Sequence, residues 1–383
     1  MEFDFLEPVE NEIIDFVQQL STQNLSNKVV FHTIDEFPDI NKIDIAIIGV
    51  IENRGQIKQQ NQVDLSPIRK ELYSLFPGNW DKTIADLGDI LPGNSLEDTY
   101  FAVQSIIASL IKNKIIPIVI GGSQDITYSL YRAYDSLEQM VNLVSIDSKF
   151  DFGKQENKIS SESYLSKIIV AEPNNLFNFS NLGYQTYFNS QEEIDLIEKL
   201  FFDAYRLGEV CNNIEIAEPV FRDADLVSID MTAIKSSDSG NNDVFCPNGF
   251  NGKEICSLSR YAGISDKTSC FGLFNHSSTK QESVLIAQIV WYFIEGVHYR
   301  SNEYPFGSKK DFIKYIVPFE NEKIIFFKSN KTERWWIEIP FFTNTNNKLK
   351  KNTLLPCTND DYIAACNQEL PQRWWKAQRK SIL

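Results

Sequence analysis

Five polar side chains follow apolar runs of the sequence at spacings that would let them share one site. They come after three different runs, and they are Gln124, Asp147, Lys149, Asp151 and Asp230. Carboxylate and amide oxygens are ligands for hard divalent cations such as Mg²⁺, Ca²⁺ and Mn²⁺. Three carboxylates that converge without a cation would repel one another strongly. The set therefore predicts an acidic pocket that needs either a metal ion or a positive side chain.

The elements that must position this pocket are the strands of a parallel α/β sheet. The apolar runs 115–120 and 141–146 read as two such strands, joined by a turn and a helix. In these sheets, chemistry is placed at the edge formed by the carboxyl ends of the strands. Residues two apart on an extended strand end point the same way. The side chains that begin at Asp147 should therefore face one pocket, and Thr232 should lie beside Asp230.

These motifs resemble those of the ureohydrolase superfamily, which includes arginase, agmatinase and formimidoylglutamase. The family has Gly-Gly-Asp-His-Ser, Asp-Ala-His-x-Asp and Ser-x-Asp-x-Asp after its strands. The corresponding segments here are Gly-Gly-Ser-Gln-Asp (121–125), Asp-Ser-Lys-Phe-Asp (147–151) and Ser-Ile-Asp-Met-Thr (228–232). A glycine-rich segment that ends in Glu254 resembles a fourth family feature. The resemblance covers roughly residues 40–297 and implies a three-layer α-β-α domain with a mostly parallel central sheet.

The resemblance also implies two manganese ions, held by six side chains, with a bridging water that attacks a guanidinium-type carbon. Three ligands remain as carboxylates, namely Asp147, Asp151 and Asp230. The other three positions carry Gln124 and Lys149, where the family has histidines, and Thr232, where it has aspartate. Gln124 still offers a carbonyl oxygen, whereas a protonated Lys149 cannot bind a metal. The chain has only three histidines, and none lies between His32 and His276, where the ligands fall.

A salt-bridged cluster of Lys149, Asp147 and Asp230 is therefore expected in place of the second metal. The predicted vestigial pocket comprises Gln124, Asp147, Lys149, Asp151, Asp230, Thr232 and Glu254. No cofactor is expected beyond at most one weakly held divalent cation (Mn²⁺, Mg²⁺ or Ca²⁺). Its ligands would be Gln124, Asp147, Asp151 and Asp230, in a single weak or vacant site.

The leading functional interpretation is a catalytically degenerate homologue that acts as a protein-binding or structural component. Without a second ion, the attacking water would lack its usual activation. The alternative is a hydrolase of linear amidine or guanidino C–N bonds, similar to formimidoylglutamase or agmatinase, with one metal ion or an altered one. The resemblance also implies a possible homo-oligomer, because family members often form trimers or hexamers.

Composition narrows the class of protein. The 383 residues carry a net charge of −15, which argues against general nucleic-acid binding because that needs a basic footprint. No apolar run approaches the roughly 20 residues of a membrane-spanning helix. The N-terminus does not resemble a secretory signal. The six cysteines form no CxxC pair, so they are interpreted as reduced thiols of a cytoplasmic protein.

Three segments are expected: an N-terminal appendage (1–40), a ureohydrolase-like domain (41–298) and an aromatic-rich C-terminal extension (299–383) with a small α+β fold. Exposed tryptophans make good interface anchors. We therefore predict that the extension contacts a protein partner of unknown identity through Trp335, Trp336, Trp374 and Trp375. The alternative is that these aromatic side chains pack the extension onto the main domain.

Overall fold

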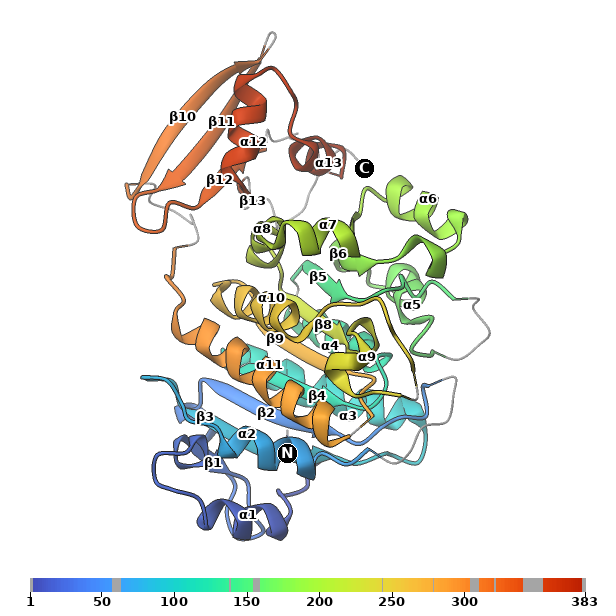
Figure 1. Ribbon diagram of the computed structural model, residues 1–383, viewed down its shortest axis with the longest axis vertical. Helices are drawn as coiled ribbons and strands as arrows, with labels where there is room; N and C mark the ends of the chain where they lie inside the picture. Colours follow the sequence, from blue (N-terminus) through green and yellow to red (C-terminus); the bar gives the residue numbers. More distant parts are fainter. Residues whose placement is uncertain are drawn as a thin grey trace.

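The computed structural model describes residues 3–56, 63–137, 139–153, 159–242, 244–277, 279–303, 310–319, 322–339 and 354–380. In these residues a nine-stranded parallel sheet forms the centre of the main domain, with the order β1-β3-β2-β4-β9-β8-β5-β6-β7 (Figure 1). Its strands are β1 (Val29–Phe31), β2 (Ile45–Val50), β3 (Ile84–Ile90), β4 (Ile116–Gly121), β5 (Val141–Ile146), β6 (Leu176–Tyr184), β7 (Asp203–Arg206), β8 (Leu226–Asp230) and β9 (Cys270–Phe274).

Helices cover both faces of this sheet. The strands are apolar on both sides, as expected for a parallel sheet buried between helices. Along β2, Ile45 and Ile47 join one hydrophobic core, whereas Ala46 and Ile48 join the other. The first core includes side chains of α1 (Asn11–Gln18), α2 (Ser66–Ser74), α7 (Leu207–Asn212), α8 (Ala217–Arg222), α10 (Gly252–Ile264) and α11 (Lys280–His298). The second includes side chains of α3 (Leu96–Lys112), α4 (Ile126–Arg132), α5 (Tyr164–Val170) and α6 (Gln191–Lys199). The predicted three-layer α-β-α fold is confirmed.

The sheet begins earlier in the chain than the sequence pattern suggested. Strand β1 lies inside the segment expected to be an N-terminal appendage, and it pairs in parallel with β3. Helix α1 packs against α2 through Ile13, which is fully buried. The first 40 residues therefore contribute an edge strand and part of one helical layer.

The C-terminal extension forms a second, antiparallel sheet with the order β10-β11-β12-β13. Its elements are β10 (Phe312–Phe319), β11 (Glu322–Ser329), β12 (Trp335–Glu338), β13 (Leu354–Cys357), α12 (Asn359–Cys366) and α13 (Gln372–Lys380). Figure 1 shows this unit at one end of the molecule, beyond α8. The predicted small α+β appendage is confirmed.

The extension is packed against the main domain by a buried arginine of α8. The Arg222 guanidinium carbon lies 4.5 Å from the ring centroid of Trp336, and its Nη2 donates to the Cys357 carbonyl at 3.0 Å. An ion pair also joins Arg334 to Glu218 at 3.1 Å. These contacts connect the extension to α8 of the main domain.

The tryptophans of the extension are mostly internal, which corrects their prediction as a partner surface. Trp335, Trp336 and Trp374 are buried, with 7%, 1% and 5% of their surfaces exposed. Trp375 is 37% exposed, although its ring lies 5.7 Å from that of Phe201. An aromatic side chain gains most by burying its large apolar surface in the chain's own core. Trp335 and Trp374 lie in the core of the extension itself, whereas Trp336 and Trp375 contact Arg222 and Phe201 of the main domain.

Candidate functional site

The acidic pocket forms at the carboxyl ends of four neighbouring strands. Gln124 follows β4, Asp147 follows β5 and Asp230 ends β8, while β9 lies between β4 and β8 in the sheet. Gln124, Asp147, Asp151 and Asp230 are all buried, none of them more than 7% exposed. The structure thus places these predicted residues at one edge of the sheet, because parallel strands end together there.

Asn275 links two sides of the pocket, although sequence analysis did not single it out. Its Nδ2 donates to Asp230 Oδ2 at 3.0 Å, and its Oδ1 accepts from the Gln124 backbone amide at 3.2 Å. It has a left-handed backbone with φ of 59°, a conformation that asparagine adopts more readily than most residues. The signal available in the sequence was a polar residue directly after the last apolar strand, β9.

Burial disfavours ionisation of all three carboxyl groups, and neighbouring carboxylates add to this for Asp147 and Asp151. Burial, together with the charge of Asp230, raises the pKa of Asp147 to about 7. Burial and the charge of Asp147 raise the pKa of Asp151 well above its ordinary value. Burial also raises the pKa of Asp230, although the amide and side chain of Thr232 oppose this. The pocket is therefore short of positive charge.

Lys149 does not supply that charge by direct contact, which corrects the predicted cluster with Asp147 and Asp230. Its Nζ lies 2.8 Å from Glu162 Oε1, and the two side chains are 41% and 48% exposed. Burial would lower the pKa of Lys149, but the bond to Glu162 and the nearby carboxylates raise it. The physical reason for the position is solvation: an ammonium group at the rim keeps contact with water and avoids the cost of burial.

Thr232 and Glu254 have local structural contacts. The Thr232 amide donates to Asp230 Oδ1 at 2.7 Å, so it fixes the orientation of that carboxylate. Glu254 closes a capping box at the start of α10, where its Oε2 accepts from the Asn251 amide at 2.8 Å. A capping box of this type satisfies the free amides of a helix terminus. The family-like position of Glu254 is thus explained by helix capping.

The oxygens of the pocket are suited to one cation at most. Gln124 Oε1, Asp147 Oδ2 and Asp151 Oδ2 are buried and lack a hydrogen-bond donor in the described part of the chain. Buried acceptors of this kind need a cation or a proton as partner, and the raised pKa values of Asp147 and Asp151 favour a proton between these two carboxyl groups when no cation is bound. The other half of a two-metal site would need ligands at Lys149 and Thr232, which offer an ammonium group and a hydroxyl. Within the described ranges, no group of three or more His, Cys, Asp or Glu side chains is arranged to hold a metal ion. A two-manganese centre therefore does not fit these residues.

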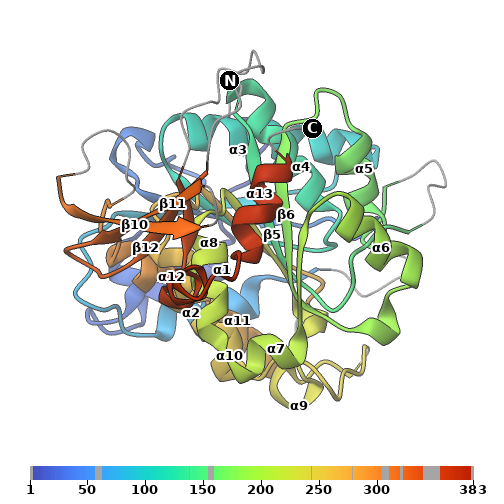
Figure 2. The same ribbon diagram turned by 90° about the horizontal axis from the view of Figure 1, so that it is seen from above.

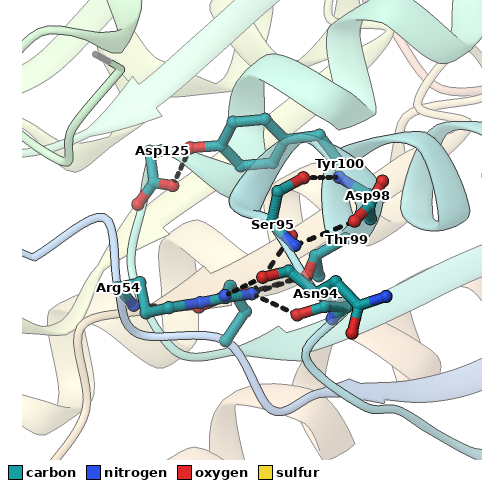
Figure 3. Close-up of polar contacts among 9 residues, drawn as sticks. Arg54, Asn94, Ser95, Asp98, Thr99, Tyr100 and Asp125 are labelled. Atoms are coloured by element: carbon teal, nitrogen blue, oxygen red, sulfur yellow. Dashed lines mark hydrogen bonds and ion pairs between the residues drawn. The ribbon is translucent and has the colours of Figure 1, made fainter.

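A second polar cluster lies beside the pocket and supports the loop that contains Arg54 and Gly55 (Figure 3). Asp125, the neighbour of Gln124, accepts a short hydrogen bond from the Tyr100 hydroxyl of α3. Burial raises the pKa of Asp125 to about 6. A Cβ atom at Gly55 would lie only 2.1 Å from Asp125 Oδ1, so this loop position requires glycine. Sequence analysis missed the pairing because Asp125 and Tyr100 lie on separate elements.

Arg54 holds the same loop against the start of α3, as Figure 3 shows. Its Nη2 lies 2.6 Å from Glu52 Oε2 and donates to the carbonyls of Gly93 and Ser95 at 3.0 and 3.2 Å. Charge-assisted bonds of this kind are stronger than neutral ones. The guanidinium group of Arg54 thus connects this loop to the start of α3, and its N–H donors are occupied by these bonds.

His276 follows β9 at this edge of the sheet, and we expect it to make the fold sensitive to acid. Burial lowers its pKa to about 4 from an ordinary value of 6.5, so between these values the unfolded chain binds a proton that the folded chain does not. Its contribution to the free energy of unfolding is constant above pH 6.5 and decreases by about 3 kcal/mol as the pH falls to 4. Urea denaturation of His276→Asn should lack this decrease. The matched change His298→Asn should retain it, and an unchanged acid sensitivity in His276→Asn would contradict the assignment.

Comparison with known proteins agrees with this fold. A family model described as the arginase family matches residues 43–238, which is more than half of the chain. A formimidoylglutamase from Lysinibacillus sphaericus is 24% identical over 196 residues, covering 49% of this chain. The aligned part spans 60% of that relative's own length.

Solved structures of similar fold cover most of the main domain. A formiminoglutamase from Trypanosoma cruzi, solved with Mn²⁺, superposes with a TM-score of 0.63 at 17% identity, covering 69% of this chain and 97% of that one. A formimidoylglutamase from Bacillus subtilis gives 0.61 at 16% identity, covering 70% and 91%. An agmatine ureohydrolase from Thermoplasma volcanium gives 0.56 at 17% identity, covering 74% and 97%. With its parallel sheet and its motifs at the matching strand ends, this chain belongs to the arginase family.

Proposed function

We propose that this chain is a non-hydrolytic member of the arginase family, which acts as a binding or structural component. The observation that carries the proposal concerns Lys149, which occupies a position where a second metal ion would need a ligand. Its ammonium group is paired with Glu162 instead. Thr232, at the other altered position, orients Asp230 through its backbone amide. The pocket therefore retains its acidic residues without ligands for a second ion.

The chemical reason is the activation of water. A two-metal site lowers the pKa of a bridging water and stabilises charge on both attacking and leaving groups. An ammonium group at the rim neither bridges two ligands nor provides a vacant coordination position. The imidazole of His276, which follows β9, is buried with a lowered pKa, so it is neutral at physiological pH.

A second candidate function is hydrolysis of a linear amidine or guanidino C–N bond with a single hard cation. The three oxygens without donors, Gln124 Oε1, Asp147 Oδ2 and Asp151 Oδ2, support this alternative. Such oxygens suit Mg²⁺, Ca²⁺ or Mn²⁺. The similar proteins named formimidoylglutamase and agmatine ureohydrolase indicate the class of substrate to test.

Metal content and turnover, measured together, distinguish the two. The intact chain is incubated with excess Mn²⁺, desalted and analysed for metal, and then assayed for ammonia, urea and formamide release from formimidoylglutamate, agmatine and arginine. We expect no more than one ion per chain and no release above the level of an Asp147→Asn variant. Turnover with one ion per chain, lost in Asp147→Asn, would replace the proposal by the second candidate. Two ions per chain with turnover would refute both the proposal and its alternative.

A further inference from the structure

A small cavity separates the C-terminal extension from the main sheet. Its volume is about 50 Å³, and it lies among the first residues of β5, β6 and β7, with α8, β13 and α13 around it. These are the amino ends of the strands, so the cavity is at the opposite edge of the sheet from the acidic pocket. Figure 2 shows α13 lying across this region beside β5 and β6.

One face of α13 carries three positive side chains toward the cavity. Arg373, Lys376 and Lys380 all line it, and spacings of three and four residues place them on the same side of a helix. Arg373 pairs with Asp361 at 3.1 Å, and Lys376 pairs with Asp203 at 3.0 Å. Two of the three cations therefore have carboxylate partners.

Lys380 is different, because it lies within ion-pair distance of no carboxylate in the described part of the chain. Its Nζ donates to the amide oxygen of Asn178 and lies 5.4 Å from the ring centroid of Phe202. The nearby carboxylate of Asp203 is already bonded to Lys376. Burial lowers the pKa of Lys380 to about 8.

The other carboxylate of the cavity wall is Asp223, which is 3.1 Å from Lys267, and Lys267 also pairs with Asp225 at 3.2 Å. The charges of Asp203 and Asp223 oppose the lowering of the pKa of Lys380 by burial. The charged side chains that line the cavity are thus three cations (Arg373, Lys376 and Lys380) and two carboxylates (Asp203 and Asp223). Apolar side chains such as Val144, Val220 and Leu355 form much of its wall, and low-polarity surroundings strengthen the attraction between opposite charges.

We propose that this cavity is a binding site for a small oxyanion, such as phosphate or a carboxylate, recognised by Lys380 with Lys376 beside it. A single water needs about 10–15 Å³ of such space, so the cavity accommodates a group of several non-hydrogen atoms. The anion would accept hydrogen bonds from the ammonium group in which donor and acceptor are both charged, whereas the present acceptor is the neutral amide oxygen of Asn178. Because the site joins α13 to β6 and β7, binding would also stabilise the docking of the extension.

The test uses the intact chain, with inorganic phosphate and acetate as separate probes at fixed ionic strength and chloride as the reference anion. Calorimetric titration should show saturable binding of at least one probe. Lys380→Gln, which keeps a hydrogen-bonding group but removes the charge, should weaken binding by about tenfold or more, whereas Lys380→Arg should retain it. Preference for phosphate or acetate identifies which type of oxyanion the site accepts.

Two controls keep the result interpretable. Lys253→Gln removes an exposed lysine on α10 and should leave binding unchanged. The thermal midpoint of each variant in chloride checks that it is folded. Binding that is equally strong in Lys380→Gln, equally weakened in Lys253→Gln, or absent for both anions at millimolar concentrations would overturn the proposal.

Discussion

Replacing Gln124 and Lys149 by histidine and Thr232 by aspartate should raise the manganese content from no more than one ion per chain to two. These substitutions supply the ligand types that the arginase-family resemblance places there, around carboxylates that are already at the same sheet edge. The imidazole in place of Lys149 also frees Glu162 from its ion pair. Metal analysis after desalting measures the effect directly.

We expect the triple variant to hydrolyse substrate once its second ion is bound, provided that the substrate-binding part of the pocket is intact. Two-metal activation of water contributes several kcal/mol to hydrolysis, so C–N bond hydrolysis should increase by orders of magnitude over the unmodified chain. The matched control adds Asp230→Asn to the same triple variant, which should lose the second ion. A folded triple variant that still binds no more than one ion would show that the three altered side chains are not the reason for the difference.

Replacing Arg69 by methionine should lower the free energy of unfolding by about 3–5 kcal/mol, the range for a broken buried ion pair. The Arg69 guanidinium bonds both Asp86 and Asp89 at 2.8 Å, and all three residues are buried. Tyr73 also donates to Asp86. Removing the cation leaves two carboxylates between α2 and β3 without a charge partner. Urea denaturation at neutral pH measures the loss.

A neighbouring residue on the same helix provides the control. Lys70 pairs with Glu12 on the surface, where the side chains are 34% and 69% exposed, and exposed pairs contribute about 1 kcal/mol or less. Lys70→Met should therefore have a small effect. Adding Asp86→Asn and Asp89→Asn to Arg69→Met should recover part of the stability, because the uncompensated charges are gone. A loss of less than about 1 kcal/mol in Arg69→Met would contradict the ion-pair argument.

The sequence predicted the main sheet well because its signals are local. The apolar runs 115–120 and 141–146 are long enough for buried strands, and they place β4 and β5 near their observed positions. Helices α3 and α6 begin at capping boxes, Ser95–Asp98 and Ser190–Glu193, which are local signals of the same kind. The edge strand β1 was missed because three residues carry too little pattern to be recognised, and its pairing with β3 depends on contacts remote in sequence.

Local sequence signals also predicted part of the candidate site. Gln124, Asp147 and Asp230 follow strands, so their positions depend on the sheet topology alone. Asn275 and the Asp125–Tyr100 pair were not identified, because their roles depend on which loops and helices meet at that edge. The spacing of residues within one motif does not predict which separate loops and helices come into contact.

The sequence by itself determined which atoms are available in the pocket: three carboxylates, an amide, an ammonium group and a hydroxyl, at strand ends that must converge. Only the tertiary structure decided how they pair. Lys149 bonds to Glu162 rather than to the buried aspartates because a rim position keeps its charge solvated. Trp335 and Trp374 are internal because they form part of the extension's own core, and Trp336 is internal because Arg222 of the main domain packs against its ring. Residue identity limits the possible interactions, whereas the cost of burying charge and the gain from burying apolar surface select among them.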